Sequence, residues 1–257
     1  MSVFNGSPFL KEAIQSILNQ TYKNFEFIIV DDASRDSTWN YLKSLKDKRI
    51  KLIQNKKNLG LAASLNIALR LAQGGFIARM DTDDISLYHR LATQLAFMLK
   101  NPKIDICGSW VKLINDRGEI IGQVRKPTQD KKIKKMNQWI TALIHPTWFA
   151  KREVFEKIGG YNPDYDMVED YDFLIRAKKF RMANINKDLL LWRSSCGRRS
   201  QKGIEQMYRK SLQVRWHYFR KGDFGIFYLP YLVRSLITTY LFPIKLKIFL
   251  NKRSGLI

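Results

Sequence analysis

The segment FIARMDTDD at residues 76–84 joins an apolar run to a cluster of carboxylates. Its apolar half predicts a short buried strand, because an uninterrupted apolar run is typical of parallel strands that are covered on both faces. Asp81, Asp83 and Asp84 follow at the point where this strand ends. Carboxylates in that position predict a ligand site at the edge of a sheet.

A second segment, FEFIIVDD at residues 25–32, has the same form and ends at Asp31 and Asp32. Apolar residues with helical spacing occupy residues 9–18 before it and 61–72 after it. Alternating strands and helices predict a parallel, doubly wound sheet, whose ligands bind outside the carboxyl ends of the strands. We therefore expect both acidic clusters at one edge of one sheet.

The pattern changes beyond residue 104. Residues 110–124 predict a hairpin with a turn at the Asn-Asp-Arg-Gly sequence 115–118. Glu169 and Asp170 then open a segment of helical character as a third acidic cluster. A carboxylate there could act as a general base that deprotonates an acceptor hydroxyl. A structural role is the competing interpretation, because the helix dipole favours carboxylates at its N-terminus.

The Asp81-Thr82-Asp83 sequence places two carboxylates one residue apart at a strand end. Mg²⁺ and Mn²⁺ prefer carboxylate, water and phosphate oxygens, so the pair can hold either cation together with a diphosphate. A solvated acidic loop or a set of helix caps is the alternative. An EF-hand is excluded, because its sixth and twelfth positions are Ser86 and Ala92 rather than Gly and Glu.

The paired carboxylates of Asp31 and Asp32 suit a different ligand group. A carboxylate at the end of such a strand can accept a hydrogen bond from a nucleotide base or ribose. Helix capping is the alternative for the neighbouring Ser34 and Asp36. Other catalytic templates, including H-E-x-x-H, G-x-S-x-G, the Walker A loop and G-x-G-x-x-G, do not occur in the sequence.

The composition is that of a globular protein, with 45% hydrophobic and 26% charged residues among 257. The net charge of +22 is concentrated near the C-terminus, where residues 189–257 hold 14 Lys and Arg against two Asp and Glu. An anionic membrane surface, a nucleotide diphosphate or nucleic acid are the partners that such charge favours. Two distant cysteines and the lack of a secretory signal favour a reducing, cytoplasmic compartment.

Residues 224–250 form an apolar but interrupted tail. Its uncharged stretches are shorter than the roughly 20 residues that a spanning helix needs. Leucine and aromatic residues interleaved with Lys and Arg predict an amphipathic helix that lies in the membrane interface. A spanning helix, or a tail buried on the domain, is the alternative.

The ordered set of motifs resembles the family 2 glycosyltransferases of the GT-A type, which build bacterial cell-surface glycans. The resemblance runs from about residue 2 to about residue 195. Its parts are FNG at residues 4–6, LNQTY at 18–22, the strand and Asp pair at 25–36, NLGLA at 58–62, RMDTDD at 79–84, HPT at 145–147, GGY at 159–161 and EDYD at 169–172.

The resemblance implies a GT-A fold, a Rossmann-like mixed sheet flanked by helices, and an inverting single displacement. It assigns the nucleotide of the donor to Asp31, Asp32, Ser2 and Phe4, with Asp81 beside them. It assigns a Mg²⁺ or Mn²⁺ ion to Asp83, with support from Asp81. It makes Asp170 the catalytic base, next to Glu169.

Two departures from the family pattern stand out. Members of the family carry a full apolar strand before the Ser-Val-Phe-Asn-Gly sequence 2–6, of which only Met1 to Phe4 is present here; we expect a shortened sequence or a misassigned start codon. They often carry a His shortly after an Arg near Arg193, where this chain has Ser-Ser. We expect Arg193, Arg198 or Arg199 to meet the diphosphate instead.

The sequence thus predicts a GT-A catalytic domain at residues 1–202 and a basic, helical, membrane-associating extension at 203–257. The predicted activity is metal-dependent transfer of a sugar from a nucleotide-sugar to a glycan or lipid-linked acceptor, peripherally at the cytoplasmic face of the membrane. A nucleotidyltransferase, a catalytically degenerate relative, and a nucleic-acid- or membrane-binding protein are the alternatives. Nucleic acid is the less favoured partner, because the aromatic residues of the tail accompany Leu and Ile.

Overall fold

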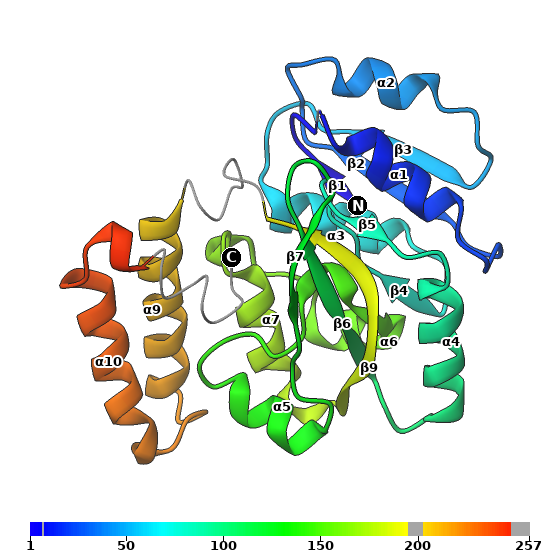
Figure 1. Cartoon of the computed structure of the whole chain (residues 1–257). Coiled ribbons are helices and arrows are strands. Elements are labelled where there is room, and N and C mark those ends of the chain that lie inside the picture. The colour runs from blue at the N-terminus through cyan, green and yellow to red at the C-terminus, as the bar shows by residue number, and fades with distance from the viewer. Residues whose placement is uncertain (7, 195–202, 248–257) are drawn as a thin grey trace.

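The structure, a computed structural model, describes residues 1–6, 8–194 and 203–247. Two sheets and their covering helices form the main body, and a pair of helices lies along one side of it (Figure 1). The predicted α/β fold of mixed sheets flanked by helices is confirmed.

The N-terminal sheet is parallel and has the strand order β1-β2-β3. Its strands are β1 (Ser2–Val3), β2 (Phe27–Asp31) and β3 (Ile50–Gln54). Two helices connect them, α1 (Leu10–Leu18) and α2 (Thr38–Ser44). Helix α1 buries Leu10, Ala13, Ile14 and Ile17, whose spacing puts them on one face toward the sheet.

The second sheet is mixed, with the order β4-β8-β6-β9-β5 and with β7 paired to β6. Only the β6–β9 pair is parallel, and the other pairs are antiparallel. The predicted hairpin at 110–124 is confirmed as β6 and β7. The strands of this second sheet are β4 (Phe76–Ala78), β5 (Ile85–Ser86), β6 (Ile106–Ile114), β7 (Ile120–Val124), β8 (Phe149–Lys151) and β9 (Met182–Arg193).

One expectation is therefore wrong. The strand that ends at Asp31 belongs to the parallel sheet, whereas the strand before Asp81 belongs to the mixed one. The two acidic clusters do not share one sheet edge. Sequence periodicity predicts strands but carries no information on which strands pair across long separations.

Helices cover both sheets and supply the remaining core. They are α3 (Leu61–Leu71), α4 (Arg90–Lys100), α5 (Asp130–Met136), α6 (Arg152–Ile158) and α7 (Glu169–Arg176). The largest buried cluster contains Trp148, which is fully buried and packs with the rings of Tyr161 and Phe173. Its packing fixes the position of α7 against the mixed sheet.

The C-terminal helices are α9 (Ile204–Arg220) and α10 (Leu229–Tyr240); α9 lies next to α7, and α10 lies on the other side of α9 (Figure 1). A separate apolar cluster joins them to α7, with Tyr171 and Ile175 on α7 and Val214, Tyr218 and Leu232 on the helical pair. Among the described residues, no helix is both long enough and apolar enough to cross a bilayer.

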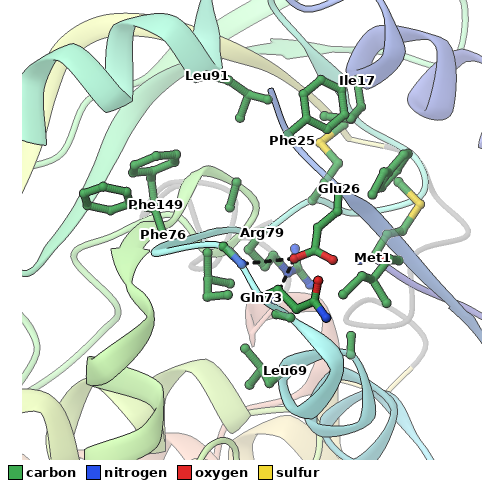
Figure 2. Close-up of a pocket in the computed structure, with 18 of the residues that line it drawn as sticks. Met1, Ile17, Phe25, Glu26, Leu69, Gln73, Phe76, Arg79, Leu91 and Phe149 are labelled. Atoms are coloured by element: carbon green, nitrogen blue, oxygen red, sulfur yellow. Dashed lines mark hydrogen bonds between the residues drawn. The ribbon is translucent and has the colours of Figure 1, made fainter. Parts of the chain in front are cut away.

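A hollow of about 600 Å³ separates β2 from β4 (Figure 2). Apolar side chains line it, among them Phe25, Leu69 and Phe76, and the Glu26 carboxylate accepts the backbone N–H of Gln73 at 2.6 Å at its rim. Protein interiors rarely contain apolar voids of this size. The contact between the two sheets is therefore less closely packed here than in the core around Trp148.

Candidate active site

Three carboxylates gather where the chain leaves β4. Asp81, Asp83 and Asp84 each offer one oxygen atom, and these atoms lie within 4.8 Å of one another. Asp81 and Asp83 are partly exposed, whereas Asp84 is buried. Hard oxygen donors at this spacing fit Mg²⁺ or Mn²⁺, which retain open positions for phosphate oxygens. The structure adds Asp84 to the predicted pair. Its position next to Asp83 in the sequence could have indicated that it belongs to the same site.

Arg193, at the end of β9, fastens this acidic loop to the body of the protein. Its N–H donates to Asp84 Oδ1 and its Nε to the Asp83 carbonyl, both at 2.9 Å. Its remaining donors reach the Asn115 carbonyl at 3.0 Å and Glu12 Oε2 at 2.5 Å. The side chain is 2% exposed. This geometry assigns Arg193 to holding the loop, and the predicted alternatives Arg198 and Arg199 lie outside the described residues.

Arg79 connects the acidic loop to the third acidic cluster. Its guanidinium is buried and forms an ion pair with Asp81. The charges of Asp81 and Glu169 raise the pKa of Arg79, against the opposing effect of its burial. The positive charge of Arg79 also acts on Asp170. One buried cation therefore brings together carboxylates from the end of β4 and from the start of α7.

Asp170 occupies the first turn of α7 and is partly exposed. Desolvation raises the pKa of Asp170 to about 6, although a hydrogen bond from the Tyr171 N–H at 2.7 Å and the charge of Arg79 oppose the shift. A carboxylate with a pKa near 6 is ionised at neutral pH and more basic than an ordinary aspartate. Glu169 is buried beside it. The charge of Asp81 also acts on Asp170, so this carboxylate lies within electrostatic range of the acidic loop.

Asp32 organises a loop between the two sheets. Its carboxylate accepts the side-chain amide of Asn55 and the backbone N–H groups of Leu59 and Gly60, all at 2.8 Å. Gly60 has a φ of +87°, and a Cβ there would lie 3.4 Å from Asp166 Oδ2, in the loop before α7. Only glycine suits this backbone and this close approach. Asp32 therefore brings the parallel sheet close to the loop that leads into α7.

The other predicted nucleotide residues lie beside Asp32. Asp31 is buried and accepts Gln54 Nε2 at 3.1 Å. Ser2 pairs with β2, and Phe4, which follows β1, exposes 46% of its surface. Asn5 adopts a positive φ of 50°, and its side-chain oxygen accepts the Arg35 N–H at 2.9 Å. The ends of β1 and β2 thus form one rim with an exposed aromatic ring.

Sequence reasoning assigned no role to the groups beneath Arg79. His145 Nε2 lies 2.9 Å from the Tyr161 hydroxyl, and both residues are buried. Burial and the charge of Arg79 hold the pKa of His145 well below its usual range, so its imidazole is neutral. The motifs HPT at 145–147 and GGY at 159–161 contain these residues. The two residues are 16 positions apart, so their contact could be recognised only from the folded structure.

An α/β fold of mixed sheets flanked by helices, with an acidic loop after β4 and a carboxylate at the start of α7, is that of the GT-A nucleotide-sugar transferases. The family described as "Glycosyl transferase family 2" matches residues 1–159, which is more than half of the chain. The chain belongs to this family.

Curated relatives share this region. An uncharacterised glycosyltransferase of Methanocaldococcus jannaschii is 38% identical over 191 residues, covering 72% of this chain and 66% of the relative. The O-antigen biosynthesis glycosyltransferase WbnJ of Escherichia coli is 34% identical over 202 residues, covering 75% and 77%. The UDP-Glc:α-D-GlcNAc-diphosphoundecaprenol β-1,3-glucosyltransferase WfgD of Escherichia coli is 37% identical over 127 residues, covering 49% of each chain. The match thus spans between half and three quarters of these relatives.

Solved structures share the fold at lower identity. Residues 1–349 of Staphylococcus aureus TarS, in complex with UDP-GlcNAc, superimpose with a TM-score of 0.67 at 20% identity, covering 83% of this chain and 63% of TarS. The mannosyltransferase PcManGT of Pyrobaculum calidifontis, in complex with GDP-Man and Mn²⁺, gives a TM-score of 0.58 at 17% identity, covering 100% and 79%.

Proposed function

We propose that this chain is a metal-dependent, inverting glycosyltransferase that moves a sugar from a nucleotide-sugar to an acceptor hydroxyl. One observation carries the proposal: three carboxylates converge at the end of β4, and the charges of Arg79 and Asp81 both act on Asp170. A candidate base and a candidate cation site thus lie within electrostatic range of one another. A transferase needs both groups, one for each side of the sugar that is transferred.

Asp83 and Asp81 would hold Mg²⁺ or Mn²⁺, with Asp84 completing the set. The bound cation would neutralise negative charge on the leaving nucleoside diphosphate. We place the nucleotide against Asp31, Asp32, Ser2 and Phe4. Three of about four acceptor positions on the Asp32 carboxylate are used within the protein, which leaves one for a base. The ligands of TarS and PcManGT support this class of donor.

Asp170 would accept the proton of the acceptor hydroxyl as that oxygen attacks the anomeric carbon. Attack from the face opposite the leaving diphosphate inverts the anomeric configuration. The raised pKa of Asp170 favours proton transfer at neutral pH. Glu169 and Arg79 would fix the position of this carboxylate, because geometry contributes a large part of such catalysis.

We infer that the acceptor is a glycan carried on a lipid diphosphate, in the synthesis of a cell-surface polysaccharide at the cytoplasmic face of the membrane. The diphosphoundecaprenol-linked acceptor of WfgD supports the lipid diphosphate, and the part of WbnJ in O-antigen biosynthesis supports the polysaccharide. The division into a catalytic domain, 1–202, and a C-terminal extension, 203–257, is part of the same proposal.

A transfer assay tests the proposed function. The protein is incubated with nucleotide-sugars, Mn²⁺ and a lipid-diphosphate-linked GlcNAc, and the product is examined by NMR. We expect a new glycosidic bond with the anomeric configuration opposite to that of the donor, and no product in EDTA. Retention of configuration, or undiminished transfer in EDTA, would contradict the proposal.

A further inference from the structure

Helix α10 exposes an unpartnered apolar face. Its residues Leu229, Val233, Leu236, Ile237 and Tyr240 recur at helical spacing and are between 39% and 64% exposed. The face turned inward contains different residues, since Leu232, Ser235 and Thr239 are buried. Leu241 and Ile244 continue the exposed apolar surface beyond the helix, at 74% and 47%. Soluble proteins rarely leave such a continuous apolar surface without a partner.

Positive charge accompanies this face. Residues 224–257 contain five Lys and Arg and neither Asp nor Glu. Arg234 is exposed on α10, Lys245 is exposed shortly after it, and Arg220 and Lys221 are exposed at the end of α9. Asp223, just before this segment, pairs with Lys178, so an excess of cations flanks the apolar stripe. Such a stripe complements a surface with an apolar interior and anionic headgroups. The excess of one sign of charge favours this surface over a protein partner of mixed charge.

The helical pair is attached to the helix that carries Asp170. The Tyr218 hydroxyl donates to Asp172 Oδ1 at 2.8 Å, and Asp172 is fully buried on α7. Arg215 contacts the Tyr171 hydroxyl at 3.3 Å and also bonds to the hydroxyl of Ser235 on α10. Any surface that holds α10 therefore also fixes the orientation of α7 relative to that surface.

We propose that the exposed face of α10 docks on an anionic membrane surface and orients the site toward acceptors held in that membrane. The orientation of the site toward membrane-held acceptors rests on the proposed function, whereas the docking does not. The docking itself depends on the five apolar residues of α10 and on the flanking cations.

Vesicle flotation without donor or metal tests the docking. We expect the protein to float with vesicles of phosphatidylcholine and phosphatidylglycerol, less so with phosphatidylcholine alone, and less so as salt rises. The double variant Leu236→Glu, Ile237→Glu should lower partitioning at least tenfold, because it removes apolar area and adds repulsion. The matched control is Ile120→Glu, Ile121→Glu on β7, where the residues are 61% and 55% exposed.

Three flotation outcomes would overturn the proposal: wild-type protein that does not float, a Leu236→Glu, Ile237→Glu variant that floats like wild type, or a control that loses binding equally. Light scattering tests whether the face binds a second copy of the chain instead. If the wild type is a dimer and the Leu236→Glu, Ile237→Glu variant is a monomer, the face serves self-association and the proposal is overturned. Circular dichroism shows whether each variant folds. Asp83→Asn should float like wild type, so loss of catalysis and loss of docking are separately visible.

Discussion

The two aspartate clusters that follow β2 and β4 look alike in sequence but differ in the structure. The Asp32 carboxylate accepts three hydrogen bonds from its own chain, two of them from backbone N–H groups. In the second cluster, the carboxylates of Asp81, Asp83 and Asp84 face one another within 4.8 Å. Carboxylates repel one another when they converge, and a cation relieves that repulsion. Asp32, in the first cluster, therefore holds a loop of its own chain in place, whereas the second cluster has the arrangement of a cation site and is called the binding cluster below.

This difference shows that an acidic pair at a strand end has no single meaning. The hydrogen bonds within the chain differ: the Asp32 carboxylate accepts two backbone N–H groups and the Asn55 amide, whereas Asp84 accepts one backbone N–H, from Arg193. Asp32 meets the N–H groups of Leu59 and Gly60 because the loop after β3 returns across it. The acidic loop after β4 is instead held from outside, by Arg193 and Arg79. Substitutions should separate the two roles.

The largest effect is expected at Asp170, the proposed catalytic base. Asp170→Asn should lower kcat about 10³-fold, since general base catalysis contributes about 10²–10⁴-fold. It should leave nucleotide affinity nearly unchanged. Asp164→Asn, an exposed aspartate in the segment before α7, is the control.

The pH profile sharpens the same prediction. The base acts as a carboxylate, and desolvation raises the pKa of Asp170 to about 6. Activity should therefore fall about tenfold per pH unit below that value and be level above it. The acidic limb of kcat/KM between pH 4 and pH 8 provides the measurement. A limb near pH 4 would show that an unperturbed carboxylate is responsible.

Arg193 tests whether the binding cluster is held from outside. Arg193→Lys keeps the charge and the backbone N–H that Asp84 accepts, but one amine cannot reach Asp83, Asn115 and Glu12 together. We expect Mn²⁺ affinity to fall about 10–100-fold, the usual effect of losing a residue that orients metal ligands. Titration calorimetry with Mn²⁺ measures it, with the exposed Arg70→Lys as control. Unchanged Mn²⁺ affinity would refute the positioning role.

Asp32→Asn and Asp83→Asn form a matched pair for stability. Asp32→Asn replaces an acceptor oxygen by a donor opposite a backbone N–H, which should cost about 2 kcal/mol and lower Tm by about 4–8 °C. Asp83→Asn should change Tm by less than about 2 °C, because its carbonyl contact to Arg193 is retained. Scanning calorimetry without metal measures both values of Tm. Equal changes in Tm would contradict the different roles assigned to the two clusters.

The smallest effect concerns the hollow between the two sheets that carry these clusters. Ala68 on α3 lines it, so Ala68→Leu should bury new apolar surface and stabilise the fold by about 1 kcal/mol, raising Tm by about 2–4 °C. Ala63→Leu, on the same helix but outside the lining, is the control. A lowered Tm for Ala68→Leu alone would mean that the space is already filled in solution.

Local patterns predicted much of this architecture. The apolar run before Asp31 gave β2, which is buried throughout, because burial of a strand on both faces needs continuous apolar residues. The run before Asp81 gave β4, but the prediction that this strand is buried was wrong, since Phe76 and Ile77 are half-buried and Ala78 is exposed. The pairing of β6 with β9, some 76 positions apart, had no local signal. The binding loop was predicted from its own carboxylates, whereas the role of Arg79 depends on groups that only the fold places around it.

Nucleotide binding tests the central claim most directly. Titration calorimetry with UDP, GDP, dTDP and CDP, first with Mn²⁺ and then with EDTA, would be repeated with Asp83→Asn for the tightest ligand. We predict that one nucleotide binds only with Mn²⁺ and that Asp83→Asn abolishes this binding, although the variant remains folded. Binding that is equally tight in EDTA, or that Asp83→Asn leaves intact, would contradict the assignment of the cluster after β4 to the metal and diphosphate.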